Sequence, residues 1–408
     1  MALFDPARHE PLAGGVWDES RAREAVGRIA AETHAAFTPD GLWPIHPADL
    51  SPERPPDCLK PLYHGAAGVI WALDGLAALG AVEAGPDYLP TVRDLARRQR
   101  EDLDRHPAVA AYMSGEQAAV WIGETGLHLL HHRLEPSAAL EDRLAAGLAA
   151  TIGDPRGLVW GGAGAMLAAL DLHEQTSGPR WAALYRDHAQ ALWDGWAHTD
   201  DAPGCWIWTQ DLYGSSARRL GALHGFLANA TALVKGRHLL APDRRDEILR
   251  RIWETVNVTA LIEGPYANWP NSLEREAQPR SLLLQYCHGA PGTVAALAEI
   301  AETPGQLALL RRAGELIWMA GPPVKPPSLC HGAAGSGLAF LKLFERTGEA
   351  VWLDRARAFA QHAIGQADRE AARHGQRKFS LWTGDLGLAI YLWNCVEGTA
   401  RFPLLDGA

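Results

Sequence analysis

The sequence predicts an all-α protein that folds as an α/α toroid, a double-layered helical barrel of seven helical hairpins. The main observation is a Gly-x-x-Gly turn that recurs along the chain, each copy followed by an apolar run of helical character. The second is that period-two alternation bounded by hairpin turns, the pattern of β-strands, is sparse. We expect one domain over residues 1–408, with residues 1–60 as an N-terminal lead-in segment.

Each copy of the turn is expected to stand at the entrance of an inner helix. Glycine allows the backbone to adopt a positive φ or to approach a neighbouring segment closely. The separations between copies run from 38 residues to 64 residues, which is enough for two helices and, in the longer cases, an inserted loop. Six complete copies and one degenerate copy, in which Ala228 replaces the second glycine, begin at Gly65, Gly123, Gly161, Gly225, Gly289, Gly332 and Gly384.

The segments that follow the later turns have helical patterns. Pro291 suits the first turn of the helix that begins after Gly289. Residues 337–348 are rich in good helix formers. The next segment places one set of apolar residues on a single helical face: Trp352, Ala356, Phe359, Ala360 and Ala363.

Seven stacked hairpins form either an open solenoid or a closed ring, and we expect the ring. In a ring the glycine turns gather at one end, so that the side chains beside them converge on a central mouth. Open stacking would instead string the cysteines and histidines of successive turns along a ridge.

Composition excludes several classes of protein. Hydrophobic residues make up 47% of the chain and charged residues 21%, which is typical of a globular protein with a large core. The net charge of -10, with both signs interspersed, gives no cationic surface for nucleic acid. The N-terminus lacks the features of a signal peptide, and no apolar run approaches the roughly 20 residues of a membrane span. We therefore expect a cytoplasmic protein.

The five cysteines are the most informative residues. An odd number, widely spaced, indicates reduced thiols, and we interpret Cys58, Cys205 and Cys395 as ordinary buried residues. Cys287 and Cys330 differ, because each is followed by His-Gly in a near-identical glycine-rich turn. Thiolates and imidazoles are ligands that zinc prefers, and rigid turns can hold them while one coordination position stays open.

The cysteine turns 43 residues apart, together with Leu220–Phe226 and Ser380–Gly387, resemble those of the lanthionine synthetase C-like proteins. The resemblance extends from Tyr63 to the last helix. It implies an α/α toroid with one zinc ion per chain, and addition of a cysteine thiol to a dehydroalanine or dehydrobutyrine residue to form a thioether. Bacterial members close rings within a peptide, whereas eukaryotic relatives resemble glutathione transferases.

Carried onto this sequence, the resemblance implies zinc ligands at Cys287, Cys330 and His331, with His224 as the catalytic acid/base. The chemistry agrees independently. A thiol with a pKa of about 8.5 becomes a strong nucleophile when a zinc ion deprotonates it. An imidazole with a pKa of about 6.5 is suited to protonating the enolate that follows the attack.

Other candidates follow from their register or from the family pattern. His288 occupies the place after Cys287, so it competes with His331 as a ligand and is also a candidate catalytic residue. Lys325 stands five residues before Cys330, where it would lower the pKa of an incoming thiol or bind a carboxylate. The candidate substrate-binding residues are His64, which begins the first turn in the same register, Asp211 and Arg377.

One position departs from the family pattern. Many relatives carry Asp or Glu four residues before the third Gly-x-x-Gly turn, and this chain has Gly157 there, with Asp154 nearby but out of register. If that carboxylate orients an acid/base histidine elsewhere in the family, its absence weakens the expectation of full cyclase activity. Asp211 is a possible substitute.

The expected partners are a dehydrated peptide or protein, glutathione as a thiol donor, and a separate dehydratase, because the chain is too short to include one. Two alternatives stay open. A non-catalytic zinc-containing module that binds a peptide or glutathione would need a closed shell of four protein ligands. An α/α-barrel glycoside hydrolase would need facing carboxylates, for which Glu124 and Asp385 are candidates, and would leave the cysteines unexplained.

Overall fold

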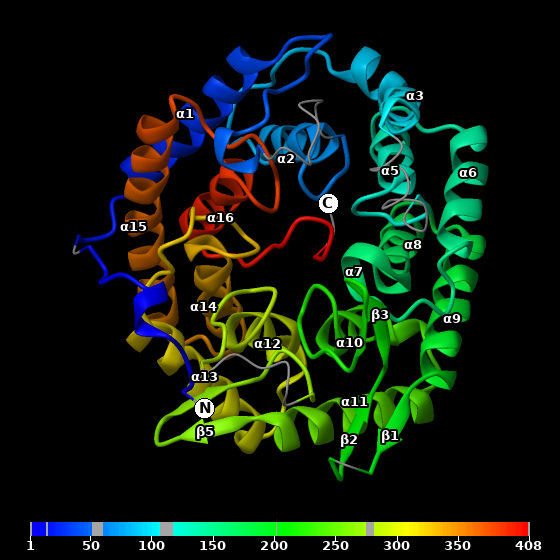
Figure 1. Cartoon of the computed structure of the whole chain (residues 1–408), viewed down its shortest axis with the longest axis vertical. Coiled ribbons are helices and arrows are strands. Elements are labelled where there is room, and N and C mark those ends of the chain that lie inside the picture. Colours follow the sequence, from blue (N-terminus) through cyan, green and yellow to red (C-terminus); the bar gives the residue numbers. More distant parts are fainter. Residues whose placement is uncertain are drawn as a thin grey trace.

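The computed structural model describes residues 2–13, 15–50, 60–106, 117–200, 202–274 and 281–406. Over these ranges the chain forms an inner and an outer layer of helices around a common centre (Figure 1). The predicted α/α toroid is therefore confirmed. None of the described helices is long and apolar enough to cross a membrane.

The inner layer begins where the glycine turns predict. Every inner helix has as its N-cap the first glycine of one turn, from Gly65 to Gly384. The inner helices are mainly apolar and buried, since they face the centre on one side and the outer layer on the other. They are α2 (Ala66–Ala78), α5 (Glu124–Leu134), α8 (Gly162–Thr176), α10 (Phe226–Lys235), α12 (Ala290–Leu297), α14 (Ala333–Thr347) and α16 (Asp385–Glu397).

The outer helices bury one face only. Three of them begin with proline, and a capping box between Thr303 and Gln306 fixes the start of one of these. The outer layer consists of α1 (Glu19–Ala36), α3 (Leu89–Arg105), α6 (Ala138–Ala149), α9 (Pro179–Asp194), α11 (Pro242–Thr259), α13 (Pro304–Ala320) and α15 (Ala350–His374). The short helices are α7 (Gly157–Trp160), η1 (Pro6–Arg8), η2 (Pro47–Asp49), η3 (Arg237–Leu239) and η5 (Ala298–Ile300).

The seventh helix pair is not a hairpin of consecutive helices. Helix α16 packs against α1, which comes from the segment that we expected to be a lead-in, and α16 also packs against α2 (Figure 1). The N-terminal segment thus supplies the seventh outer helix. Ring closure depends on contacts between the two ends of the chain.

The second glycine of each complete turn permits a close backbone approach. A Cβ atom at Gly335 would lie 1.9 Å from the carbonyl oxygen of Leu329, and one at Gly68 would lie 2.0 Å from that of Leu62. In each case the carbonyl belongs to the residue six positions earlier. The turn before α10 takes a different path, with φ of +154° at Gly225, and this turn accommodates Ala228.

Backbone hydrogen bonds join the loops that precede neighbouring inner helices. Tyr63 N donates to Trp121 O (2.8 Å), and Trp382 N donates to Tyr63 O (3.1 Å). Four more hydrogen bonds of the same kind follow: Cys330 N donates to Trp382 O, Cys287 N to Cys330 O, Ala222 N to Cys287 O, and Leu158 N to Leu223 O. These bonds fix the loops against one another around the mouth of the toroid.

The two longest spacings between turns contain three two-stranded antiparallel hairpins, which the all-α prediction did not include. They pair Ala197 with Ile207, Gln210 with Ala217, and Leu261 with Asn268. The strands are β1 (Ala197–Thr199), β2 (Cys205–Ile207), β3 (Gln210–Leu212), β4 (Ser215–Ala217), β5 (Leu261–Glu263) and β6 (Tyr266–Asn268). At three residues each, they are too short to produce a clear alternation in the sequence.

The segment after α16 turns into the ring (Figure 1). Phe402 is buried and packs on Tyr286, with ring centroids 4.6 Å apart. Asp406 forms ion pairs with Lys235 on α10 (2.6 Å) and Lys342 on α14 (3.1 Å). This segment therefore links α10 with α14 and packs against the turn before α12.

Candidate metal centre

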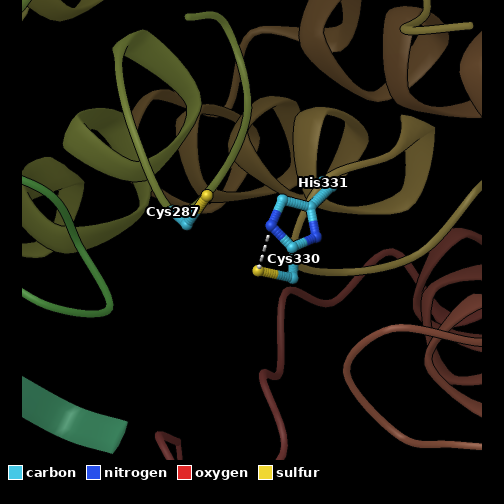
Figure 2. A group of neighbouring side chains, drawn as sticks. All are labelled: Cys287, Cys330 and His331. Atoms are coloured by element: carbon cyan, nitrogen blue, oxygen red, sulfur yellow. Dashed lines mark hydrogen bonds between the residues drawn. The ribbon is translucent and has the colours of Figure 1, made fainter. Parts of the chain in front are cut away.

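Two consecutive glycine turns bring Cys287, Cys330 and His331 together at the mouth of the toroid (Figure 2). Their ligand atoms all lie within 4.8 Å of one another. Cys330 Sγ is 3.4 Å from His331 Nε2. The hydrogen bond from Cys287 N to Cys330 O holds the two turns in this relation. The geometry thus brings together the three side chains that the family resemblance implies as ligands.

Burial gives this cluster its electrostatic character. Burial raises the pKa of the Cys287 thiol, but hydrogen bonding with Cys330 and the nearby imidazoles of His288 and His331 outweighs it and lowers that pKa well below its ordinary value. Burial, and next the Cys287 sulfur, raise the pKa of Cys330 well above its ordinary value. The pair therefore favours one thiolate and one thiol, and a bound cation would compensate a second thiolate.

The donor set fits zinc. Two sulfurs and one imidazole nitrogen are soft and borderline ligands, and three protein ligands are typical of sites that keep a position open for substrate. Among the described residues, the group that could hold a metal contains these three side chains, and His288 lies outside it.

His224 and His288 form a second pair beside the cluster. Their Nε2 atoms are 3.1 Å apart, and the Nδ1 atoms of both rings are buried without a hydrogen-bond partner in the described part of the chain. Burial, and then the neighbouring His288, lower the pKa of His224 to about 3. Burial also lowers the pKa of His288. Both imidazoles are therefore neutral at pH 7.

Two aromatic residues hold the ring of His224. Trp160 and Tyr213 each pack edge-on against it, with centroids 5.4 Å and 5.7 Å away. The same two residues line an open pocket of about 420 Å³, together with Arg156, Asp211 and neighbouring residues of the β3–β4 hairpin. Asp211, a predicted substrate-binding residue, is thus an exposed residue of a pocket that borders the histidine pair.

The structure explains Gly157. A Cβ atom there would lie 2.8 Å from the Cα atom of His224 and 2.7 Å from the carbonyl oxygen of Leu223, and φ is +86°. The backbone of the His224 loop therefore leaves no room for a carboxylate side chain at this position. Asp154 does not replace it, because its carboxylate pairs with Arg156 at 2.7 Å.

The other predicted residues are more scattered. Lys325 is exposed, and its Nζ lies 3.4 Å from Gln285 Oε1, beside the cysteine turns. His64 is half-buried and packs edge-on against Tyr63. Arg377 is only 4% exposed, so it does not present its charge to a substrate. It pairs with Glu32 (2.7 Å), Asp368 (3.3 Å) and Asp385 (3.5 Å), which gives it a structural role.

Sequence reasoning missed two residues that contact the cysteines. The hydroxyl of Tyr63 donates to Cys330 Sγ at 2.9 Å, and Gln285 Nε2 donates to Cys287 Sγ at 3.0 Å. Burial, followed by the charge of Cys330, raises the pKa of Tyr63 well above its ordinary value, so this phenol stays protonated. Tyr63 stands two residues before Gly65, the register that Cys330 occupies before Gly332, and an alignment of the repeats would have marked it.

The remaining cysteines and the rival carboxylates have structural surroundings. Cys205 and Cys395 are buried and form no disulfide, as predicted, and Cys58 lies outside the described residues. Glu124 pairs with Arg100 at 2.8 Å. Asp385 is 7% exposed and pairs with Arg377, so it does not face an open cleft as a glycoside hydrolase would require.

These features define a ring of paired helices with a Cys-Cys-His candidate metal centre at one mouth. Residues 60–406 match the family model of the lanthionine synthetase C-like proteins, and the chain belongs to this family.

Two known proteins illustrate the relationship. The Danio rerio protein named glutathione S-transferase LANCL1 is 26% identical over 211 residues, which cover 51% of this chain and 49% of that protein. The match thus spans about half the length of this curated relative. The structure of nisin cyclase superimposes with a TM-score of 0.55 over 95% of this chain and 96% of that one, at 13% identity. That likeness shows a shared fold.

Proposed function

We propose that this protein catalyses the conjugate addition of a cysteine thiol to a dehydroalanine or dehydrobutyrine residue, which forms a thioether. The observation that carries the proposal is the juxtaposition of the Cys287–Cys330–His331 cluster with the His224–His288 pair at one mouth of the ring. One group of residues suits metal binding and the other suits proton transfer, as addition of a thiol to a double bond requires.

Cys287, Cys330 and His331 would hold one zinc ion. When bound, zinc supplies a coordination position at which a substrate thiol ionises near neutral pH. The short spacing of the three ligand atoms and the burial of both sulfurs support this assignment.

The histidine pair supplies the proton route. A neutral imidazole of the pair accepts the proton that the substrate thiol releases. The sulfur then bonds to the β-carbon, the carbon–carbon π bond breaks, and an enolate forms at the α-carbon. His224 returns the proton to that carbon, so that one thiol and one alkene give one thioether with no other reagent consumed. Because burial lowers the pKa of His224 to about 3, the ring is neutral at rest and holds the proton only between the two transfers.

The surroundings suit a peptide acceptor. The pocket lined by Trp160, Tyr213 and Asp211 borders His224 and offers aromatic and polar contacts to residues that flank a dehydroamino acid. Lys325 lies beside the cysteine turns, where it would attract a thiol that carries a carboxylate. We include glutathione as a candidate thiol donor on this basis and because a relative is named a glutathione S-transferase.

The dehydrated acceptor would come from a separate dehydratase, and the reduced thiols suit a cytoplasmic location.

The test uses a peptide with one dehydroalanine and one cysteine, incubated with the zinc-loaded protein with and without glutathione. Mass spectrometry would detect a gain of one glutathione if addition is intermolecular, and alkylation would reveal loss of the free thiol at constant mass if a ring closes. Rates are compared with those of Cys330→Ala and of buffer alone. The absence of acceleration under both conditions would contradict the proposal and favour the non-catalytic binding module.

A further inference from the structure

We infer that Tyr63 and Gln285 are positioning residues that tune the two ligand thiolates, each donating one hydrogen bond to one sulfur. This inference rests on the proposed metal centre. The donors come from two different turns: the Tyr63 hydroxyl lies 2.9 Å from Cys330 Sγ, and Gln285 Nε2 lies 3.0 Å from Cys287 Sγ.

Tyr63 reaches Cys330 only because the ring is closed. The residue precedes α2, in the first turn of the chain, and is separated from Cys330 by 267 positions. Its carbonyl oxygen accepts a hydrogen bond from Trp382 N, and its ring stacks on that of Trp382 with an interplanar angle of 13°. Cys330 N in turn donates to Trp382 O. The phenol is therefore held by the same loop that holds the cysteine backbone.

Gln285 is fixed at both ends of its amide. Its Nε2 donates to Cys287 Sγ two residues ahead, while its Oε1 faces Lys325 Nζ at 3.4 Å. Gln285 is buried, with 7% of its surface exposed, so the amide has little freedom to turn away. The contact with Lys325 orients the amide so that its NH₂ group, rather than its oxygen, faces the sulfur.

The consequence concerns how much charge the sulfurs give to the metal. Two thiolates would cancel the charge of a zinc dication, which would weaken its hold on a substrate thiol. A hydrogen bond to a thiolate withdraws electron density from the sulfur, so more positive charge stays on the metal and a substrate thiol ionises more readily. With one hydrogen-bond donor on each sulfur, the effect on the electron density given to the metal is shared by both ligands.

The experiment uses the full-length protein with cobalt(II) in place of zinc, which reports sulfur donation through the thiolate-to-cobalt charge-transfer band. The variants are Tyr63→Phe and Gln285→Met, which remove the donor and keep most of the volume. The matched controls are Tyr185→Phe, whose hydroxyl donates to the carbonyl of Ala232 at 2.9 Å, and Gln366→Met, whose buried amide donates to Pro323 O at 2.8 Å.

We expect each test variant to shift the band to longer wavelength, because a sulfur without the donor gives up its electrons more easily. Zinc affinity, measured by competition with a chromogenic chelator, should nevertheless fall about 10- to 100-fold, because the lost donor no longer positions the sulfur or stabilises its thiolate form. The controls should change neither. Unchanged spectra and zinc affinities in both test variants would overturn the inference.

Two further measurements keep the outcomes separate. Circular dichroism and thermal unfolding establish that each variant is folded, and the two test variants act on different sulfurs, so that misfolding of one leaves the other informative. The spectra require no turnover. If the wild-type protein binds cobalt through two thiolates but forms no thioether, the proposed function fails while this inference stands.

Discussion

The Nε2 atoms of His224 and His288 face each other at 3.1 Å, so one imidazole donates a hydrogen bond and the other accepts it. The two residues come from the turns before α10 and α12, which the backbone hydrogen bond from Ala222 N to Cys287 O ties together. A proton that enters at one ring therefore has a direct partner at the other. This relation makes both residues candidates for the chemistry.

Replacement of either histidine should reduce the rate of thioether formation without loss of zinc. We expect His224→Ala to lower the rate about 10²- to 10⁴-fold, the usual contribution of a general acid or base, and His288→Phe to lower it by less. The rate is measured by mass spectrometry and the zinc content by elemental analysis. The exposed His238 provides the control His238→Ala. A loss of zinc in His224→Ala would instead assign that residue to the metal.

Replacement of a ligand cysteine should remove the metal. Cys287→Ala and Cys330→Ala are expected to lower the bound zinc from one ion per chain toward zero, because two remaining ligands hold zinc poorly. Cys205→Ala, at an equally buried thiol of strand β2, should keep the full complement. Elemental analysis of protein purified without chelators decides between the outcomes, and zinc retained in both ligand variants would refute the assignment.

Two glycines of the same helix should respond in opposite ways to alanine. In α2, a Cβ atom at Gly68 would meet the Leu62 carbonyl oxygen at 2.0 Å, whereas one at Gly75 has nothing within 4 Å. We expect Gly75→Ala to raise the free energy of unfolding by about 0.5–1 kcal/mol, because alanine is the better helix former. Gly68→Ala should lower it by about 1–3 kcal/mol through overpacking. Urea unfolding of both variants measures the difference, and equal effects would contradict the close approach.

Asp385 should make the protein less stable as the pH rises from about 4 to 6. Burial raises the pKa of this carboxyl to about 6, and Arg377 opposes that shift only in part. The folded state thus binds the proton more tightly than the unfolded state, so stability falls between the unfolded and the folded pKa. The Asp385→Asn variant has no carboxyl group that titrates at this position. Its stability relative to the wild type should therefore increase over the same pH interval. Urea midpoints at pH 4, 5, 6 and 7 test the slope, and a relative decrease would be inconsistent with a raised pKa.

The sequence was sufficient to locate the inner layer and the candidate ligands, because both follow from local patterns. Glycine is required where the first turn of an inner helix packs closely against a carbonyl oxygen of the preceding loop, as Gly335 does against that of Leu329. Cys287 and Cys330 share that register, so their convergence follows once the ring closes.

Features that depend on distant pairings were not predictable in this way. The outer partner of α16 is α1, which no local pattern indicates. Arg377 has the charge of a substrate-binding residue, but its guanidinium pairs with Glu32 and Asp368. Glu32 is 345 positions away in the sequence, and Asp368 lies on helix α15. The three-residue strands are too short for the alternation of apolar and polar residues to be recognised in the sequence. The role of Tyr63 also depends on a contact that spans most of the chain.

The pairing of α1 with α16 has a consequence for biosynthesis. Helix α1 buries apolar residues, among them Val26 and Ile29, and packs against α16, which is synthesised long after it. Until α16 has been synthesised, the nascent chain therefore exposes an apolar face of α1 without its native cover. Partly made molecules are at risk of association with one another or of capture by chaperones. The ring can close only after α16 has left the ribosome.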